Sequence, residues 1–282
     1  MKLNKLFAVL LAALLILSSV AALADITIGV PDDTTNEARA LQLLVDNGII
    51  ELAEGAGETA TKADVIADGI EIVEIQADQI VNQLPDLDYA VINGNYVMDA
   101  IAADFDISAP LALEAEEAYL PRANVIAVKG ENADADLTKA LVAAVTSQQV
   151  KDYITDTYAG AVISVVENPT DGYDPDVDYD ALAGQTITIA ATPAPHAQIL
   201  EIVKQILAEK DITLDIAVYS GYTEENPAVD AGDVYANYFQ HQPYLDDYVA
   251  ETGGNVVTVA VVHTEPMGLY GGKQADLSAL GK

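Results

Sequence analysis

Short apolar runs alternate with stretches in which apolar residues recur at helical spacing along most of the chain after residue 25. The runs in the first half of this region predict buried strands at 25–30, 70–75, 89–93 and 124–129. The helical spacing predicts helices at 34–47, 78–84, 137–145 and 148–158. Thr34 is the predicted N-cap of the first helix, with Glu37 as its capping-box partner.

A second series of the same kind begins near residue 184. It predicts strands at 186–191, 214–219, 234–238 and 256–262, and a short extended segment at 267–271. A helix that follows His196 has a clear apolar stripe, and another helix is predicted at 244–251. Strands that alternate with helices indicate an α/β fold with parallel or mixed sheets and ligand sites at the carboxyl ends of strands.

Residues 168–180 separate the two series. This segment contains proline, glycine and five aspartates without apolar periodicity, which is typical of a linker. A calcium loop remains an alternative because aspartates alternate at 174, 176, 178 and 180, although the glycine and glutamate of such loops are missing. Two α/β series divided by a linker predict two lobes with a ligand cleft between them.

Residues 1–24 resemble a secretory signal peptide. Lys2 and Lys5 precede an apolar run, and Ala22-Leu23-Ala24 is a cleavage signal, so cleavage is predicted before Asp25. An uncleaved membrane anchor is the alternative, because the run is nearly long enough to cross a bilayer. Either way, the mature protein is predicted to lie outside the cytoplasm, in a periplasm or at the extracellular face of the membrane.

Composition then narrows the class of partner. The chain has 282 residues, 51% of them hydrophobic, which excludes intrinsic disorder. Its 45 acidic and 12 basic residues give a net charge of −33, so nucleic acids and anionic lipids are poor partners. We expect this acidity to reflect a solvated surface, and an adaptation to high salt stays open.

The residue types also limit the chemistry. Cysteine is absent, which excludes disulfides, thiol catalysis and a lipid-modified cysteine in this sequence. The histidines, His196, His241 and His263, are not at metal-ligand spacing, so no metal site is predicted. No nucleophile elbow, P-loop or dinucleotide fingerprint is found, so neither an enzyme nor a cofactor is predicted.

Several separate segments share one resemblance: TPAPHAQIL at 192–200, NYFQHQPYL at 237–245, PDDTTNEARALQLLVDNGII at 31–50, YAVINGNY at 89–96 and ANVIAVK at 123–129. Together they resemble the NlpA family, the methionine-binding lipoproteins of ABC importers. The resemblance implies a two-lobed periplasmic-binding-protein-like (type II) fold with two mixed sheets and a hinge.

The order of these segments departs from the family, because the segments that open a family member come last here. We interpret this order as a circular permutation in which a linker joins the old termini; misaligned segments are the alternative. The resulting division is 1–24 signal peptide, 25–128 one lobe, 129–167 helices returning to the other lobe, 168–183 linker, 184–265 the other lobe, and 266–282 a crossover tail. The absent lipobox cysteine puts membrane tethering in doubt.

The resemblance also implies a binding site for a free amino acid. Arg39 would hold the ligand carboxylate, and a guanidinium near a helix N-terminus suits an anion. Asn93 and Asn124 would contact the ligand's ammonium and carboxylate groups, because an amide both donates and accepts. The remaining predicted ligand-binding residues are Asn36, His196, Tyr222, Phe239 and His241. Turn chemistry at Asn93, core packing of Phe239 and helix capping by His196 are the structural alternatives, and Arg122 is taken as a surface charge.

The sequence therefore predicts a monomeric solute-binding protein that delivers methionine, a related amino acid or a methionine-containing dipeptide to ABC permease subunits. Hinge closure of the lobes around the ligand would be the mechanism. The alternative is a secreted ligand-sensing or interaction module with a degenerate pocket.

Overall fold

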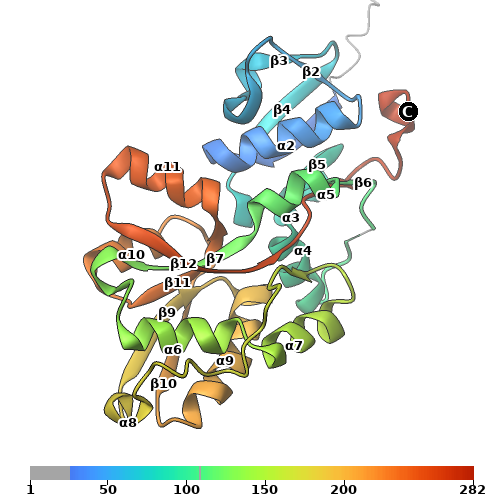
Figure 1. The fold of residues 1–282 in the computed structure, drawn as a ribbon. Coiled ribbons are helices and arrows are strands. Elements are labelled where there is room, and N and C mark those ends of the chain that lie inside the picture. Colours follow the sequence, from blue (N-terminus) through green and yellow to red (C-terminus); the bar gives the residue numbers. More distant parts are fainter. Residues whose placement is uncertain (1–25, 108) are drawn as a thin grey trace, which may run out of the picture.

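The computed structural model describes residues 26–107 and 109–282, and the predicted signal peptide with its cleavage site before Asp25 lies outside them. The described chain forms two α/β lobes, each built around its own mixed sheet (Figure 1). No helix in these two described ranges has both the length and the apolar character that a membrane span requires. The predicted α/β class with two mixed sheets is confirmed.

The smaller lobe contains a five-stranded sheet in the order β4-β1-β5-β13-β6. Its strands are β1 (Ile26–Pro31), β4 (Ile70–Ile75), β5 (Tyr89–Ile92), β6 (Ala112–Leu113) and β13 (Gly268–Gly271). The first three are parallel, whereas β13 runs antiparallel to both β5 and β6. The C-terminal strand therefore completes a sheet that the first half of the chain begins. A separate ribbon pairs β2 (Glu51–Leu52) with β3 (Val65–Ile66).

The larger lobe contains a six-stranded sheet in the order β10-β9-β11-β7-β12-β8. Its strands are β7 (Asn124–Lys129), β8 (Ile163–Ser164), β9 (Thr186–Ala191), β10 (Thr213–Val218), β11 (Ala236–His241) and β12 (Val256–Thr264). Strand β7 lies antiparallel between β11 and β12. The range 25–128, assigned to one lobe from the sequence, thus extends too far, because β7 bonds to the strands of the other lobe.

Helices cover both sheets. Those of the smaller lobe and its edge are α2 (Thr34–Asp46), α3 (Ile80–Gln83), α4 (Gly94–Ala102) and α5 (Glu116–Tyr119). Those of the larger lobe are α6 (Asp136–Val145), α7 (Gln148–Tyr158), α8 (Tyr179–Leu182), α9 (Gln198–Ala208), α10 (Glu225–Ala231) and α11 (Gln242–Thr252). Single turns of helix occur at Gly57–Thr59, Lys62–Asp64, Ala77–Gln79, Leu84–Asp86, Leu120–Arg122, Gly130–Asn132, Pro193–Ala197 and Leu277–Leu280.

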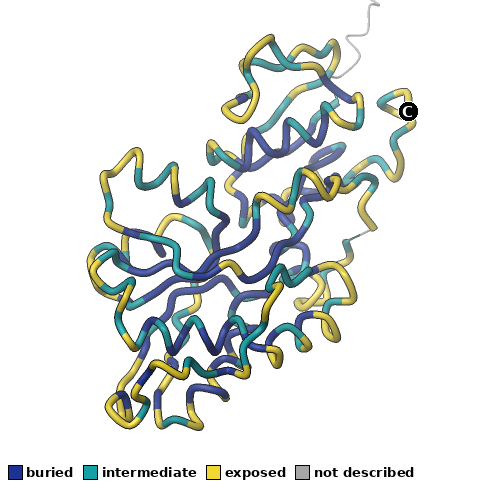
Figure 2. The backbone as a smooth tube through the Cα atoms, in the orientation of Figure 1, coloured by how far each residue is buried: buried dark blue, intermediate teal, exposed yellow. Residues whose placement is uncertain are grey.

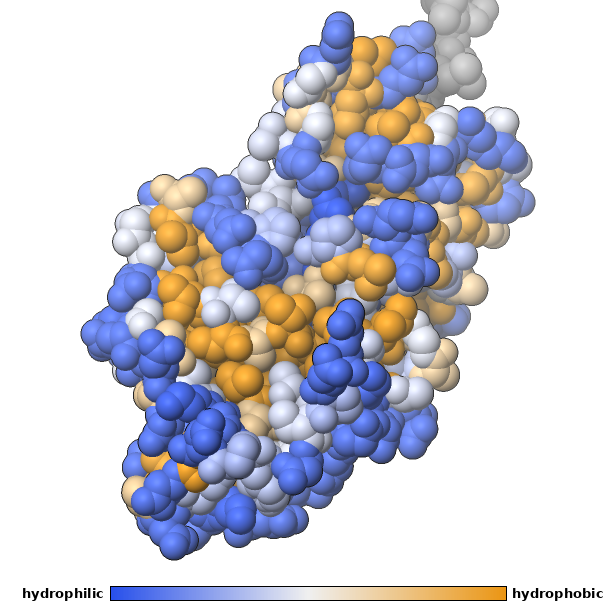
Figure 3. All heavy atoms as spheres, in the orientation of Figure 1, coloured by the Kyte–Doolittle hydropathy of each residue, from blue (hydrophilic) through white to orange (hydrophobic). Residues whose placement is uncertain are grey.

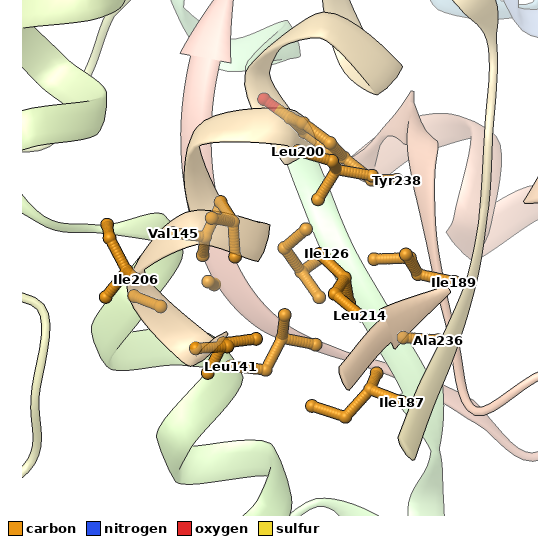
Figure 4. Packing of buried hydrophobic residues seen from close by; sticks show 14 of the residues in the cluster. Ile126, Leu141, Val145, Ile187, Ile189, Leu200, Ile206, Leu214, Ala236 and Tyr238 are labelled. Atoms are coloured by element: carbon orange, nitrogen blue, oxygen red, sulfur yellow. The ribbon is translucent and has the colours of Figure 1, made fainter. Parts of the chain in front are cut away.

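Each lobe has its own apolar core, and burial follows the strands and the inner faces of the helices (Figure 2). In the larger lobe, Ile126, Ile187 and Ile189 on the sheet pack with Leu141 and Leu200 from α6 and α9 (Figure 4). On the face shown in Figure 3, hydrophilic residues cover much of the edge of both lobes. Separate cores allow the lobes to form the walls of a site between them.

Several predicted elements match the structure residue for residue, namely the strands at 70–75, 124–129 and 186–191 and the helix at 148–158. The predicted cap of the first helix is wrong. Asp33, not Thr34, accepts the hydrogen bond from the Asn36 backbone N–H at 3.0 Å. The Glu37 carboxylate instead accepts from the Lys62 backbone N–H at 2.7 Å. A carboxylate at residue 33 outcompetes the hydroxyl as a cap.

The segment 168–180 is irregular but packed against the larger lobe. The Thr170 hydroxyl donates to the Ala143 carbonyl at 2.5 Å, and the Tyr173 hydroxyl donates to Glu209 at 2.8 Å. Asp178 caps α8, and Asp174 accepts from the Asp176 backbone N–H. These aspartates do not converge into a group of metal ligands within the described ranges, so the calcium alternative gains no support.

The chain passes between the lobes in two crossover segments among the described residues, 114–123 and 265–267. They lie side by side: the Glu114 backbone N–H donates to the Met267 carbonyl at 3.0 Å, and the Met267 backbone N–H donates to a Glu114 carboxylate oxygen at 2.6 Å. Thr264 also donates to the Tyr119 carbonyl at 2.9 Å. Any movement of one lobe relative to the other must therefore pass through this paired connection.

One buried carboxyl group generates a prediction about pH. Glu225 begins α10 with no exposed surface, its Oε1 has no hydrogen-bond partner, and burial raises its pKa from 4.5 to about 7. A raised folded-state pKa stabilises the fold fully below about pH 4.5, and this contribution is lost as the pH rises through about 7. We expect Glu225→Gln to remove this pH dependence.

The measurement is urea unfolding at pH 5 and pH 8. Between pH 5 and pH 8, the free energy of unfolding of the wild type should fall by up to about 3 kcal/mol more than that of Glu225→Gln. The exposed Glu251 gives a matched control, since Glu251→Gln should retain the wild-type loss. Equal losses in the wild type and Glu225→Gln would contradict the assignment.

Candidate functional site

A polar cavity lies between the two lobes, next to the crossover segments. The predicted site residues Asn36, Arg39, Asn93, Asn124, Tyr222, Phe239 and His241 all line it. His196 lies behind the cavity wall instead. The sequence did not identify the other lining residues, Gly94, Asn95, Gln240, Tyr244 and Glu265.

The fold brings these residues together at the ends of strands. Asn93 directly follows β5, Asn124 begins β7, which runs antiparallel to β11, and His241 ends β11. The first two turns of α2 add Asn36 and Arg39 from the smaller lobe. Strand ends and helix starts leave side chains free to face a ligand, which is the usual location of sites in α/β folds.

Arg39 is the buried cation of the site. Its Nε donates to Glu114 Oε1 at 2.7 Å, and its Nη2 donates to Glu114 Oε2 at 2.6 Å. Nη2 also donates to the Glu265 carbonyl at 3.1 Å. The two side chains are 5% and 3% exposed, so this is a bidentate ion pair shielded from water. Among the described residues, Nη1 forms no hydrogen bond, so this edge of the guanidinium can bind an anion.

Asn36 links three neighbours at the base of the cavity. Its amide nitrogen donates to both Asp33 carboxylate oxygens at 2.9 and 3.1 Å. Its Oδ1 accepts from Asn93 Nδ2 at 2.9 Å and lies 3.3 Å from His241 Nε2. The side chain is thus fully used in positioning, and it fixes the orientation of the Asn93 amide.

His241 is held as a neutral imidazole. Its Nδ1 accepts from the Tyr244 backbone N–H at 3.2 Å, so Nε2 carries the proton and points to Asn36. Burial lowers the pKa of His241 to about 3, and the nearby positive charge of Arg39 adds to the effect. His241 therefore contributes shape and a hydrogen-bond donor, without positive charge.

Two polar atoms in the cavity wall are buried without partners. Asn93 Oδ1 lacks a donor, and Asn95 Nδ2 lacks an acceptor, among the described residues. Asn95 Oδ1 is occupied, because the Tyr222 hydroxyl donates to it at 2.7 Å. An unmade hydrogen bond costs about 1–3 kcal/mol when the group is buried. These atoms are consequently suited to a ligand that brings both a donor and an acceptor.

Aromatic rings form another wall of the cavity. Tyr222 lies 5.9 Å from both Phe239 and Tyr244 between ring centroids, and Phe239 lies 5.8 Å from Tyr244. The Tyr244 hydroxyl donates to the Tyr222 carbonyl at 3.0 Å, which fixes the loop carrying Tyr222. Such a wall favours an apolar or sulfur-containing ligand group.

His196 positions Asn124 from behind. Its Nε2 lies 3.0 Å from Asn124 Oδ1, and its Nδ1 lies 2.7 Å from the Thr192 hydroxyl. Burial lowers the pKa of His196 to about 3, so the ring is neutral. With its oxygen occupied, Asn124 offers its Nδ2 to the cavity. His196 is therefore a supporting residue and does not line the cavity.

The structure does bring together three potential metal ligands, which the spacing in the sequence did not predict. Ligand atoms of His196, His263 and Glu265 all lie within 4.8 Å of one another. Each imidazole nitrogen already has a partner: His196 bonds Thr192 and Asn124, and His263 bonds the Tyr238 hydroxyl and Glu265. The cluster is a hydrogen-bond network, and its chemistry requires no ion to satisfy it.

Helix α4 joins the lobes on the other side of the cavity. Besides the Asn95–Tyr222 bond, the Tyr96 hydroxyl donates to the Ser220 carbonyl at 3.1 Å. Asp99 Oδ1 accepts from the Ala194 backbone N–H at 2.8 Å, and burial raises the pKa of Asp99 to about 6. These bonds connect opposite lobes beside the cavity. The sequence pattern did not predict α4.

The chain is similar in sequence to proteins of one family. The model of the NlpA lipoprotein family matches residues 16–166 and 187–282. The methionine-binding lipoprotein MetQ of Bacillus subtilis is 45% identical over 85 residues, which are 30% of this chain and 31% of that protein. The D-methionine-binding lipoprotein MetQ of Escherichia coli is 31% identical over 141 residues, 48% of this chain and 50% of that protein.

Solved structures match in part as well. Lipoprotein Tp32 from Treponema pallidum is 31% identical, with a TM-score of 0.40 over 48% of this chain and 56% of that chain. A nutrient-binding protein from Burkholderia cenocepacia bound to methionine is 40% identical, with a TM-score of 0.27 over 29% of this chain and 35% of that chain. The chain spans between about a third and a half of the length of the relatives it matches in sequence.

The Arg39–Glu114 pair generates a prediction about stability. Glu114→Gln keeps the shape of the side chain but leaves a buried guanidinium without its counter-charge, so we expect a loss of about 3–5 kcal/mol. The pair between Arg122 and Glu58 provides the control, because Glu58 is 83% exposed there. Glu58→Gln should cost less than about 1 kcal/mol. Urea unfolding measures both, and similar small losses would count against the importance of the buried pair.

Proposed function

The chain belongs to the NlpA lipoprotein family, and from this premise we propose that it is an extracytoplasmic solute-binding protein of an ABC importer. Its ligand is methionine or a related amino acid, delivered to ABC permease subunits, and the protein acts as an exported monomer. The observation that carries the proposal is the polar and aromatic cavity between the lobes, with its unpartnered amide atoms. The relatives named for methionine binding support this ligand class.

The charged end of an amino acid fits the polar side of the cavity. In the proposed complex, Arg39 Nη1 and Asn124 Nδ2 bind the ligand carboxylate, since neither nitrogen has a partner among the described residues. Asn93 Oδ1 accepts from the ligand ammonium, which removes its unsatisfied state. Asn36 and His241 keep the Asn93 amide in place.

The side chain of the ligand would lie against Tyr222, Phe239 and Tyr244. A thioether makes favourable contacts with aromatic rings, which supports methionine within the class of apolar amino acids.

Ligand delivery would use the hinge formed by the crossover segments 114–123 and 265–267. A ligand that contacts Arg39 on one lobe and Asn124 on the other favours the closed state, which the permease would recognise. The cavity contains no nucleophile activated by a general base, and the relatives are named for binding, so we infer a binding protein and not an enzyme. A ligand-sensing or interaction module with a degenerate pocket is the second candidate.

We also propose that the chain is a circular permutation of the family's order. The family match breaks between residues 166 and 187, around the predicted linker 168–183. Ile26 and Leu280 line one groove, so the two ends of the described chain lie near each other. Old termini joined through a surface segment and new termini opened nearby are physically tolerated in such folds.

The proposed function is tested by thermal unfolding of the purified protein with single amino acids and methionine dipeptides. L-Methionine at about 100 times its Kd should add roughly 2.7 kcal/mol of stability, a rise in Tm of about 5–10 °C. Arg39→Ala should abolish this rise, whereas Arg122→Ala, which changes the chain's other arginine, should keep it.

Because Arg39→Ala also leaves Glu114 unpaired, Asn93→Ala serves as a second variant, which should weaken binding while keeping the ion pair. A rise with another amino acid would keep the solute-binding function and change the ligand. No rise with any compound would favour the module with a degenerate pocket.

A further inference from the structure

Glu265 is a carboxylate in the cavity wall whose role the family resemblance did not supply. It lies in the crossover segment directly after β12, is 6% exposed and lines the cavity together with Arg39 and Asn93. Its Oε2 accepts from His263 Nε2 at 2.8 Å. Its Oε1 forms no hydrogen bond among the described residues. One oxygen is therefore fixed from behind, and the other is available to the cavity.

The surroundings hold this side chain rigidly. His263 has no exposed surface, and its other ring nitrogen bonds the buried Tyr238 hydroxyl. A Cβ built on Gly94 would lie 2.9 Å from Glu265 Cγ, so the start of α4 packs closely on the side chain. The Glu265 carbonyl accepts from Arg39 at 3.1 Å, which fixes the backbone as well. Glu265, held by His263, Gly94 and Arg39, is therefore preorganised for contact with a ligand.

The carboxylate stays ionised. Burial alone would raise its pKa, but the charge of His263 and its hydrogen bond hold the pKa of Glu265 below the ordinary value. A buried carboxylate requires a positive partner or several donors to remain stable. Only one donor to its side chain is present among the described residues, so the site is suited to one more cationic donor.

The charges of the cavity wall lead to the same conclusion. The positive charge of Arg39 is balanced by Glu114, and His241 is neutral. The Glu265 carboxylate forms no ion pair with an arginine or lysine of the cavity wall, and its charged neighbour is His263, which donates to Oε2 only. A ligand with a carboxylate alone would add a further negative charge, whereas a zwitterion adds a positive group at the same time.

We propose that Glu265 Oε1 binds the ammonium group of the ligand and thereby restricts the site to amino acids with a free α-ammonium. The inference rests on the proposed solute-binding function and deepens it by naming the group that selects the ligand class. Arg39 Nη2 donates to the backbone carbonyl of Glu265, so the residue that carries the cation and the residue that carries this carboxylate are in contact in the cavity wall. An α-amino acid carries the complementary pair of charges on one carbon, with Asn93 Oδ1 taking a second ammonium hydrogen.

The test compares L-methionine with 2-hydroxy-4-(methylthio)butanoate, which replaces the ammonium by a hydroxyl and keeps the rest. Isothermal titration of the wild type should show at least about 30-fold tighter binding of L-methionine. Glu265→Gln should weaken the affinity for L-methionine by at least about 30-fold and change the affinity for the hydroxy compound by less than about 3-fold. Glu225→Gln makes the same change at a buried carboxyl outside the cavity and should leave both affinities unchanged.

Equal binding of the two compounds by the wild type would overturn the inference, whatever the variants do. The inference would also be overturned if a folded Glu265→Gln protein lost affinity for both compounds equally, because that result indicates a structural role. If Glu265→Gln does not fold, Glu265→Asp, which retracts the charge, replaces it in the same comparison and should weaken the binding of L-methionine more than that of the hydroxy compound. A wild type that binds neither compound refutes methionine binding itself, which separates failure of the proposed function from failure of this inference.

Discussion

The buried ion pair between Arg39 and Glu114 is the interaction on which the site depends. Arg39 belongs to α2 in the smaller lobe, whereas its partners, the Glu114 carboxylate and the Glu265 carbonyl, lie on the two crossover segments. One side chain thus connects a lobe to both crossover segments. Because the pair is shielded from water, separating its members would leave two uncompensated charges, at a cost that opposes large distortion of these segments. The guanidinium is held in one orientation before any ligand arrives.

This arrangement divides the polar groups of the cavity into two kinds. Asn36 in the wall, and His196 and Tyr238 behind it, use their polar atoms on other protein groups and act by orienting neighbours. Asn93 Oδ1, Asn95 Nδ2 and Glu265 Oε1 have no such partner among the described residues, and they belong to residues that line the cavity. Preorganised groups with unused capacity lower the ordering cost of binding, which favours affinity for a small ligand. The bonds of Asn95 and Asp99 to the larger lobe connect the two lobes beside these groups.

Much of the fold and of the candidate site could be predicted from the sequence, and the features that could not be predicted have physical causes. Strands β4, β7 and β9 were predicted to the residue because buried strands are short, apolar and bounded by turn residues. Helix α4 was missed because Asn93-Gly94 is also a turn signal, and its helix is stabilised by contacts with Ala194 and Tyr222 that the local sequence does not reveal. Gln240 and Tyr244 lie within the segment 237–245, which is one of the segments that carry the family resemblance. Glu114 and Glu265 could not be predicted as site residues, because the sequence does not show which few of the 45 acidic residues are buried.

The position of the site also explains why the proposed permutation is compatible with function. The cavity lies at the carboxyl end of β5, next to the crossover segments, while Ile26 and Ile70 begin β1 and β4 at the opposite end of the same sheet. The groove where Ile26 and Leu280 meet is at that amino end, beside the end of α2. New chain ends there leave Arg39, both crossover segments and every lining residue in place. The chemistry depends on which groups meet in space, and the order in which the chain visits them changes only the connections far from the ligand.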